Sequence, residues 1–257
     1  MRVLRSAFLS AQQSSRRMAH LVLLNWSLPI PALNKLWDLS DFKICADGGA
    51  NRLYDHAGPS SSMQPSLIVG DLDSLRDDVK NYYLQRQVPL IDLSHDQDST
   101  DLEKCLNYLQ ANVMGPLQAS SSGQEVEQEE DQPLILVLGA FGGRLDHTIS
   151  NINVLYQFRH LNIVLWGEGN LVRLIRGPGE TLIVPNLEVE ARGGCGLVCL
   201  GEPCVASSRG LKWDLADTKL SIGGLLSTCN KVLGEDVWVK TDKDLLWITT
   251  LPVDWGG

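Results

Sequence analysis

Aspartate residues follow several predicted strands of this chain, at the point where each strand ends. Short apolar runs lead into four segments, Asp47-Gly-Gly, Asp71-Leu-Asp, Asp96-Gln-Asp-Ser-Thr-Asp and Gly142-Gly-Arg-Leu-Asp. If these strands are parallel neighbours, their carboxyl ends open onto one crevice, which is where open α/β sheets bind ligands. Clustered carboxylates repel one another unless cations neutralise them. Mg²⁺ carrying a polyphosphate supplies that positive charge, so the pattern predicts an enzyme that acts on a metal–nucleotide complex.

Asp71 and Asp73 stand two residues apart, directly after the third predicted strand at residues 66–69. In an extended loop both carboxylates can point the same way and share one hard cation. A solvated turn is the ordinary alternative, because aspartate commonly begins turns. The Asp-x-Asp-x-Leu pattern is also similar to the haloacid-dehalogenase phosphatases, whose first aspartate is a nucleophile. Against that similarity, the pattern here does not follow the first strand, and Ser74 stands where Thr or Val is usual.

Asp98 and Asp101 lie three residues apart where a helix is expected to begin. Thr100 and Glu103 have the spacing of a capping box, and acids near a helix start are favourable without any catalytic role. Capping alone explains less well why Asp96 lies close to Asp98 and Asp101 in the sequence, because three negative charges repel one another unless a positive charge neutralises them.

A glycine-rich loop at residues 139–143 leads from a predicted strand to a predicted helix and ends at Arg144. Such a loop offers backbone N–H groups and a helix N-terminus to phosphate, and a guanidinium can hold phosphate oxygens with two hydrogen bonds. The loop is not a Walker A motif, since no Gly-Lys-Ser or Gly-Lys-Thr follows. The alternative for Arg144 is an ion pair with a surface acid.

Two polar or aromatic segments interrupt the strands predicted near the C-terminal end, at residues 210–214 and 227–230. Trp213 in the first segment could stack on a flat heterocycle. By itself, this feature favours a tryptophan in the core or at its rim.

Alternating strand and helix patterns fill residues 20–168, which predicts an α/β domain with a largely parallel sheet in the middle of three layers. Its first strand runs into Pro29 and Pro31, which predict a turn. Residues 169–257 show short apolar runs separated by Gly and Pro, which predicts a smaller all-β sandwich or barrel domain. Ligand sites are common between domains.

Two further segments lie outside these patterns. Residues 119–132 are rich in Ser, Gln and Glu without apolar periodicity, which predicts a disordered acidic insertion. Residues 1–19 contain four arginines and no acid, a composition similar to that of a mitochondrial transit peptide. We favour a disordered leader, because the folded pattern begins only at His20.

The composition narrows the class of protein. The chain has 257 residues and a formal net charge of −9, which argues against a general partner of nucleic acids or anionic membranes. No apolar run approaches the roughly 20 residues that span a bilayer. The six cysteines contain no CxxC pair, which favours buried free thiols in a reducing compartment, and so a cytoplasmic protein.

Taken in order, six motifs of the chain resemble those of the thiamine pyrophosphokinase family. The resemblance covers most of the chain from about residue 20 to residue 250. The motifs are Ala46-Asp-Gly-Gly-Ala-Asn-Arg-Leu, Gly70-Asp-Leu-Asp-Ser, Asp98-Ser-Thr-Asp, Gly142-Gly-Arg-Leu-Asp-His, Gly210-Leu-Lys-Trp and Ser227-Thr-Cys-Asn. The resemblance implies an N-terminal α/β catalytic domain, a C-terminal β domain and a homodimer with active sites between the subunits. It also implies transfer of the terminal pyrophosphate of ATP to the hydroxyethyl group of thiamine, which releases AMP.

The same resemblance suggests a role for each matching residue. Asp71, Asp73 and Asp101 look like the Mg²⁺ ligands. The other positions are implied as follows: Asp47 and Asp98 lie beside the metal, Gln97 and Arg144 meet the ATP phosphates, Asp146 positions the acceptor or the metal, and Trp213, Ser227 and Asn230 bind thiamine from the partner subunit.

The residue types suit this chemistry independently. Pyrophosphoryl transfer needs neutralised polyphosphate charge and an aligned hydroxyl, and little covalent help from the protein. Asp73 and Asp101 are both candidates for accepting the hydroxyl proton. Two other hypotheses remain at this stage: a phosphatase that forms an aspartyl phosphate at Asp71, and a sensor that binds thiamine or nucleotide without catalysis.

Overall fold

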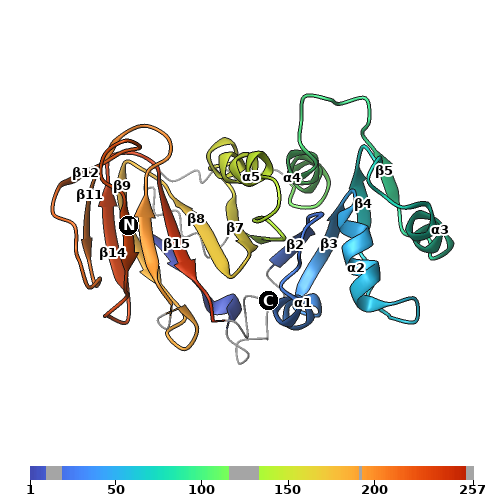
Figure 1. The fold of residues 1–257 in the computed structure, drawn as a ribbon, viewed down its shortest axis with the longest axis horizontal. Coiled ribbons are helices and arrows are strands. Elements are labelled where there is room, and N and C mark those ends of the chain that lie inside the picture. Colours follow the sequence, from blue (N-terminus) through green and yellow to red (C-terminus); the bar gives the residue numbers. More distant parts are fainter. Residues whose placement is uncertain (10–18, 116–132, 191–192, 253–257) are drawn as a thin grey trace.

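The computed structural model describes residues 1–9, 19–115, 133–190 and 193–252, and Figure 1 shows their fold. A ten-stranded sheet runs through the molecule in the order β13-β10-β15-β8-β7-β6-β2-β3-β4-β5. The six strands from β7 to β5 are parallel to one another. Their bounds are β2 Ala19–Leu23, β3 Ser40–Ala46, β4 Leu67–Gly70, β5 Leu90–Asp92, β6 Leu134–Leu138 and β7 Asn162–Gly167.

Five helices pack on the two faces of this parallel region. Residues of α1 (Ile30–Trp37), α2 (Gly49–Ala57) and α3 (Asp77–Gln85) share one hydrophobic cluster with Leu21 and Leu23 of β2. Residues of α4 (Asp101–Asn112) and α5 (Leu145–Gln157) share a second cluster with Val22 of the same strand. Because successive side chains of a strand point to opposite faces, the two clusters lie on opposite sides of the sheet. The predicted α/β class is confirmed.

Helix α1 was not expected, because Pro29 and Pro31 predicted only a turn. Pro29 is the N-cap residue of α1, and Pro31 lies in its first turn. Proline is tolerated there because the first N–H groups of a helix have no partner within the helix. The apolar residues Leu33, Leu36 and Trp37 then bury one side of α1.

The C-terminal part of the chain extends the same sheet before it forms a second one. Strand β8 (Asn170–Ile175) pairs antiparallel with β7, and β15 (Leu245–Thr250), β10 (Cys195–Val198) and β13 (Ser227–Asn230) follow. A five-stranded sheet has the order β1-β9-β14-β11-β12. The bounds of its strands are β1 Arg2–Arg5, β9 Gly179–Val184, β14 Val237–Thr241, β11 Cys204–Arg209 and β12 Thr218–Leu220. A third cluster unites residues of both sheets, which makes this part a β-sandwich.

The smaller β-rich part that the sequence predicts is therefore present. Its sheet is continuous with that of the α/β part, because β7 and β8 are hydrogen-bonded neighbours on either side of residue 168. The division of the chain at residues 168 and 169 stays a prediction.

The expectation of a disordered leader over residues 1–19 is wrong for the first residues. Arg2–Arg5 form β1, which pairs in parallel with β9, and Ala7–Leu9 form a short 3₁₀ helix. Leu4 and Leu9 are buried, so this segment contributes apolar side chains to the core. The sequence did not indicate this, because arginines surround the two leucines. Residues 10–18 and the predicted insertion at 119–132 lie outside the described residues.

No helix in the described part of the chain has the length and apolar character needed to cross a membrane.

Candidate active site

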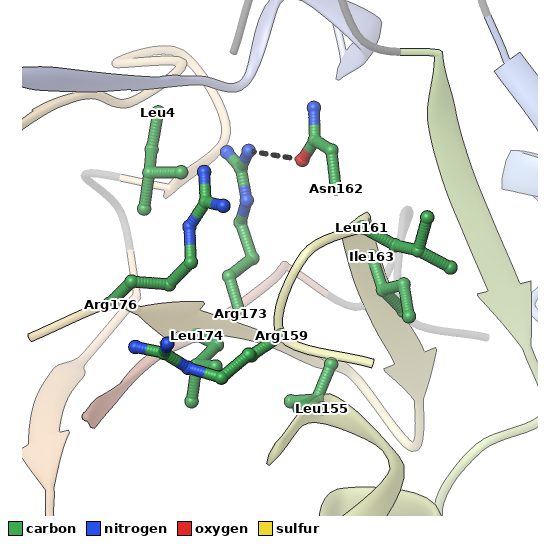
Figure 2. Close-up of a pocket in the computed structure, with 9 residues that line it drawn as sticks. All are labelled: Leu4, Leu155, Arg159, Leu161, Asn162, Ile163, Arg173, Leu174 and Arg176. Carbon is green, nitrogen blue, oxygen red and sulfur yellow. Dashed lines mark hydrogen bonds between the residues drawn. The ribbon is translucent and has the colours of Figure 1, made fainter. Parts of the chain in front are cut away.

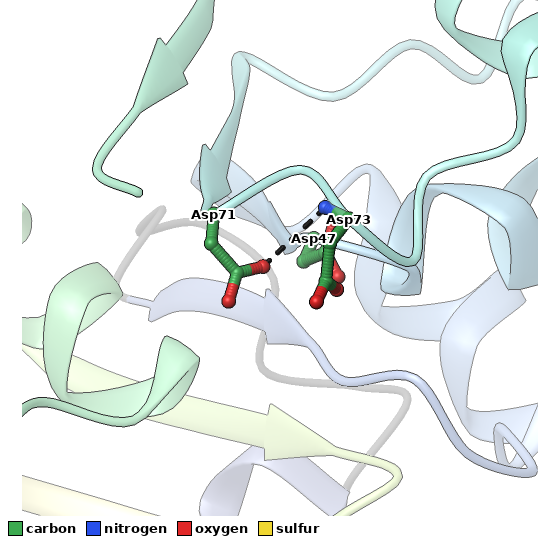
Figure 3. Close-up of side chains that lie close together, drawn as sticks. All are labelled: Asp47, Asp71 and Asp73. Atoms are coloured by element: carbon green, nitrogen blue, oxygen red, sulfur yellow. Dashed lines mark hydrogen bonds between the residues drawn. The ribbon is translucent and has the colours of Figure 1, made fainter. Parts of the chain in front are cut away.

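Three aspartates meet at the carboxyl ends of β3 and β4. Asp47 follows β3, Asp71 and Asp73 follow β4, and oxygens of the three carboxylates lie within 4.8 Å of one another. Figure 3 shows the three side chains converging from two loops, with the backbone N–H of Asp73 donating to Oδ1 of Asp71 over 3.4 Å. The parallel pairing of β3 with β4 is the reason why residues far apart in sequence end side by side.

Asp47 is the most buried member of this group. Its backbone adopts a φ of 43°, and the backbone N–H of Ser74 donates to its Oδ2 over 3.1 Å. Its Oδ1 is buried and has no hydrogen-bond partner among the described residues. Burial raises the pKa of this carboxyl, and hydrogen bonds from Gly48 and Ser74 oppose that shift.

Asp101 reaches the group from the first turn of α4. Thr100 caps this helix, and its reciprocal bonds with Glu103 form the predicted capping box. Oδ1 of Asp101 is also buried, without a hydrogen-bond partner in the described part, and lies 3.8 Å from Nζ of Lys104. Burial, and then the nearby Asp47 and Asp71, raise the pKa of Asp101 to about 6.

Asn51 of α2 holds the loop that carries Asp71 and Asp73. Its Nδ2 donates to the carbonyl oxygen of Ser74 over 2.7 Å, and its Oδ1 accepts from the backbone N–H of Arg76 over 3.1 Å. Both bonds involve a side chain that is almost fully buried. The downstream end of the aspartate loop is therefore tied to a helix, which limits how far the carboxylates can separate.

A cavity of about 510 Å³ opens beside these carboxylates. Its walls come from the loops after β2, β3, β4 and β6 and from the N-terminal turns of α4 and α5. The polar or charged residues that line it are Asn25, Trp26, Asp47, Arg52, Asp71, Ser74, Ser99, Thr100, Asp101, Lys104, Arg144, His147, Ser150 and Asn151. The volume lies within the range of small-molecule sites. The cavity lies where the strand order reverses between β2 and β6, as expected for an open α/β sheet.

Arg144 lines this cavity from the end of the glycine loop, directly before α5. Its guanidinium is largely exposed, and its Nε donates to Oδ1 of Asp146 over 3.0 Å. That hydrogen bond lowers the pKa of Asp146. Asp146 itself is exposed and does not line the cavity, so the structure places it beside Arg144 and not among the clustered carboxylates.

Gln97 and Asp98 are exposed on the segment between β5 and α4, and neither lines the cavity. Nε2 of Gln97 donates to the carbonyl oxygen of Ser94 over 2.6 Å, and the backbone N–H of Asp98 donates to Oδ1 of Asp96 over 3.1 Å. The first bond turns the Gln97 side chain back onto its own loop, whereas the second involves only the main chain of Asp98. The predicted roles of Gln97 at the ATP phosphates and of Asp98 beside the metal stay predictions.

Trp213, Ser227 and Asn230 form a separate group in the β-sandwich. Trp213 and Asn230 exchange hydrogen bonds between main chain and side chain, and the indole of Trp213 is 54% exposed. Ser227 and Asn230 belong to β13, the first strand of the large sheet, whereas Asp71 follows β4, the ninth. Eight strand spacings separate them, roughly 38 Å at about 4.8 Å each. Figure 1 shows the β-sandwich toward one end of the molecule and β4 toward the other.

Several cavity residues were missed by the sequence analysis. Asn25 and Trp26 follow the central strand β2, and Lys104 lies one helical turn after Asp101. A polar residue at the end of a buried parallel strand was the available signal for Asn25. For Lys104 the spacing from Asp101 was available, but an exposed ion pair on a helix has the same spacing.

A second, much smaller cavity lies at the opposite edge of the parallel strands, near the start of β7 (Figure 2). Arg173 of β8 donates to Oδ1 of Asn162 over 3.1 Å and to the carbonyl oxygen of Arg5 over 3.0 Å. These bonds link β1, β7 and β8. The cavity's volume of about 10 Å³ suits no more than one water molecule, so its lining is structural.

Comparison with known proteins agrees with this geometry. Residues 33–166 match the family model described as "Thiamin pyrophosphokinase, catalytic domain", and residues 180–246 match "Thiamin pyrophosphokinase, vitamin B1 binding domain". The chain belongs to the thiamin pyrophosphokinase family. The carboxylates and Arg144 of the cavity lie in the part that matches the catalytic domain, whereas Asn25 and Trp26 precede it. Trp213, Ser227 and Asn230 lie in the part that matches the vitamin B1 binding domain.

Relatives of the thiamin pyrophosphokinase family resemble the chain over most of its length. It is 38% identical to "Thiamine pyrophosphokinase 2" of Arabidopsis thaliana, over 90% of this chain and 85% of that protein. It is 32% identical to "Thiamine pyrophosphokinase" of Saccharomyces cerevisiae, over 91% of this chain and 86% of that one. The solved yeast thiamin pyrophosphokinase superposes with a TM-score of 0.80 at 29% identity, over 99% of this chain and 92% of the other. The solved enzyme of Candida albicans gives 0.81 at 27% identity, over 98% and 93%.

Proposed function

We propose that this chain transfers the pyrophosphoryl group of ATP to the hydroxyl of thiamine, giving thiamine diphosphate and AMP. One observation carries the proposal. In a chain of this family, carboxylates from three separate segments and an arginine from a fourth line one cavity of about 510 Å³. Membership of the family does not favour the phosphatase or the non-catalytic sensor.

The carboxylate group has the properties of a site for a divalent cation. Asp47, Asp71 and Asp73 crowd their negative charges, and the buried Oδ1 atoms of Asp47 and Asp101 have no hydrogen-bond partner within the described residues. Such an arrangement is unfavourable without a cation, and oxygen donors are the ligands that Mg²⁺ prefers. We infer that Asp71, Asp73 and Asp101 hold Mg²⁺ with Asp47 beside them. The ion would neutralise polyphosphate charge when bound.

The remaining roles follow from position. Arg144 can bind phosphate oxygens at the mouth of the cavity, and Asp146 orients its guanidinium through their hydrogen bond. Asp73 and Asp101 are the two candidates for accepting the hydroxyl proton of the acceptor. The pKa of Asp101 is raised to about 6 while no cation is bound, and bound Mg²⁺ would lower it, so this carboxylate would be ionised in the loaded site.

We also propose that the active enzyme is a homodimer and that each site uses residues of both subunits. Trp213, Ser227 and Asn230 lie too far from the carboxylates of their own chain to act with them on one thiamine molecule. Large apolar side chains are exposed both beside the cavity, at Leu145 and Ile149 of α5, and near β13, at Ile222, Leu225 and Leu233. Apolar surface of this kind is typical of regions that another subunit covers.

We propose that the protein is located in the cytoplasm. The cysteines at 45, 105, 195, 199, 204 and 229 are all free thiols, as is usual in a reducing compartment. Cell fractionation would test it, and recovery in the mitochondrial matrix would contradict it.

The enzymatic proposal is tested by incubating the purified protein with ATP, Mg²⁺ and thiamine and quantifying all products. We expect thiamine diphosphate and AMP in equal amounts. Release of ADP would contradict pyrophosphoryl transfer, and thiamine binding without AMP under any divalent metal would favour the sensor. A phosphorylated Asp71, found by mass spectrometry after trapping, would favour the phosphatase.

A further inference from the structure

Trp26 connects three loops at the wall of the carboxylate cavity. It lies directly after β2, lines the cavity and is 38% exposed. Its Nε1 donates to Oε1 of Glu168, which follows β7, over 3.0 Å. The indole therefore extends from the central strand across β6 to the strand on its far side, over the loop that leads to Arg144.

The glycine loop after β6 supports this indole. A Cβ atom placed on Gly143 would lie 2.6 Å from Cζ3 and 2.7 Å from Cη2 of Trp26, and one placed on Gly142 would lie 2.8 Å from Cδ1. The six-membered ring thus lies against Gly143 and the five-membered ring against Gly142. Both glycines have positive φ, 106° at Gly142 and 63° at Gly143, so the loop adopts a path that favours glycine and leaves room for the ring.

The indole is consequently held in one orientation before any ligand arrives. The glycine backbone lies against it, the bond to Glu168 fixes its edge, and the residue lines the cavity while remaining partly exposed. A rigid aromatic surface costs little entropy when a flat ring stacks on it. Base–aromatic stacking is a common way to bind a nucleobase, because every base has a π-face.

We propose that Trp26 is the platform on which the nucleobase of the nucleotide substrate stacks. This inference rests on the proposed function, in which that substrate is ATP. The position favours a base over the phosphates, since Trp26 is uncharged whereas Arg144 and the carboxylates provide the charged part of the same cavity. It also favours the nucleotide over the acceptor, because Trp26 spans the β2–β6 reversal where open α/β sheets bind nucleotides.

The experiment separates the base from the phosphates. For the wild type, Trp26→Phe and Trp26→Ala, one measures the KM for ATP, the KM for thiamine and the inhibition constant of inorganic tripolyphosphate, which has no base. We expect Trp26→Ala to raise the KM for ATP about tenfold, which corresponds to about 1.4 kcal/mol. The tripolyphosphate constant should stay within about twofold of the wild-type value, since base stacking contributes nothing to it. Trp26→Phe should retain most of the affinity for ATP because it keeps an aromatic face.

Trp238→Ala is the matched control. Trp238 lies on β14 in the five-stranded sheet and also donates its Nε1 to a glutamate, Oε2 of Glu180, over 3.3 Å. Its removal should leave all three constants unchanged. An unchanged KM for ATP in Trp26→Ala would overturn the stacking role. So would an equal weakening of ATP and tripolyphosphate, which would mean that the ring only positions the loop of Arg144, or a rise in the KM for thiamine alone. A wild-type protein that forms no AMP would instead refute the proposed function itself.

Discussion

At the scale of single residues, the carboxylates of Asp71 and Asp73 are the groups on which the proposed chemistry depends most directly. We expect Asp71→Asn and Asp73→Asn each to lower turnover roughly a hundredfold or more, because an amide binds Mg²⁺ more weakly than a carboxylate. The measurement is formation of thiamine diphosphate, with thermal unfolding to show that the variants stay folded. Asp77→Asn, an exposed acid in the first turn of α3, is the control and should retain activity. Near-normal rates in both active-site variants would exclude the metal role.

Asp101 gives a prediction about pH because its folded-state pKa is raised from 3.8 to about 6. Between these values the folded state of the metal-free protein binds more protons than the unfolded state, so the free energy of unfolding falls as pH rises through this range. The amide that Asp101→Asn introduces does not titrate. The Tm of this variant relative to the wild type, measured with a chelator present, should therefore be higher at about pH 7.5 than at about pH 5. An equal difference at both values would show that the Asp101 carboxyl is not strained by its neighbours.

Removal of the bound cation should reveal the same repulsion between the clustered carboxylates. Because Mg²⁺ binds the folded state, its addition should raise the Tm of the wild type at about pH 7.5, and a chelator should reverse the rise. Asp71→Asn should show a smaller rise. The same shift in both proteins would place the ion elsewhere.

At the scale of elements, the site depends on a link between α2 and the loop after β4. Asn51→Ala removes both hydrogen bonds of the Asn51 amide, to Ser74 and Arg76, and should lower the free energy of unfolding by roughly 1–3 kcal/mol. It should also raise the Mg²⁺ concentration needed for half-maximal activity, since the aspartate loop loses its anchor. Asn112→Ala, at the exposed end of α4, is the control because its amide donates only locally, to the carbonyl oxygen of Tyr108. An unchanged Mg²⁺ requirement in Asn51→Ala would reduce Asn51 to a purely structural role.

Some helices and strands could be predicted from local sequence patterns, and others could not. The capping box at Thr100 and Glu103 was predictable because both bonds are local and their spacing is fixed. Strand β1 was not, since a four-residue strand gains its stability from pairing with β9, which lies far away in the sequence. The place of Gln97 and Asp98 outside the cavity was not predictable either, because it depends on how the segment between β5 and α4 lies relative to the other loops.

For the molecule as a whole, the distance between Trp213 and the carboxylates is the reason why we propose a site shared by two subunits. Mixing Asp71→Asn with Trp213→Ala tests this, because a mixed dimer would contain one site in which both contributions are intact. If the subunits exchange freely, half of the dimers are mixed and half of their sites are whole, so roughly one quarter of wild-type activity should return. Each variant alone should stay nearly inactive. If the mixture gained nothing although exchange was demonstrated, each site would belong to one chain.

Periodicity, spacing and side-chain chemistry are properties of short segments, and they were enough to predict the α/β class, the local capping of α4 and the residue types expected of a metal–polyphosphate site. The three-dimensional fold was needed to show that Asp47 joins Asp71 and Asp73, that Asn51 anchors their loop and that Trp26 lies over the glycine loop. It also decided that the β-sandwich continues the sheet of the α/β part, so that Trp213 lies far from the carboxylates of its own chain. The physical reason is strand order: hydrogen bonding between strands that are distant in sequence determines which loops meet, and no local pattern encodes that order.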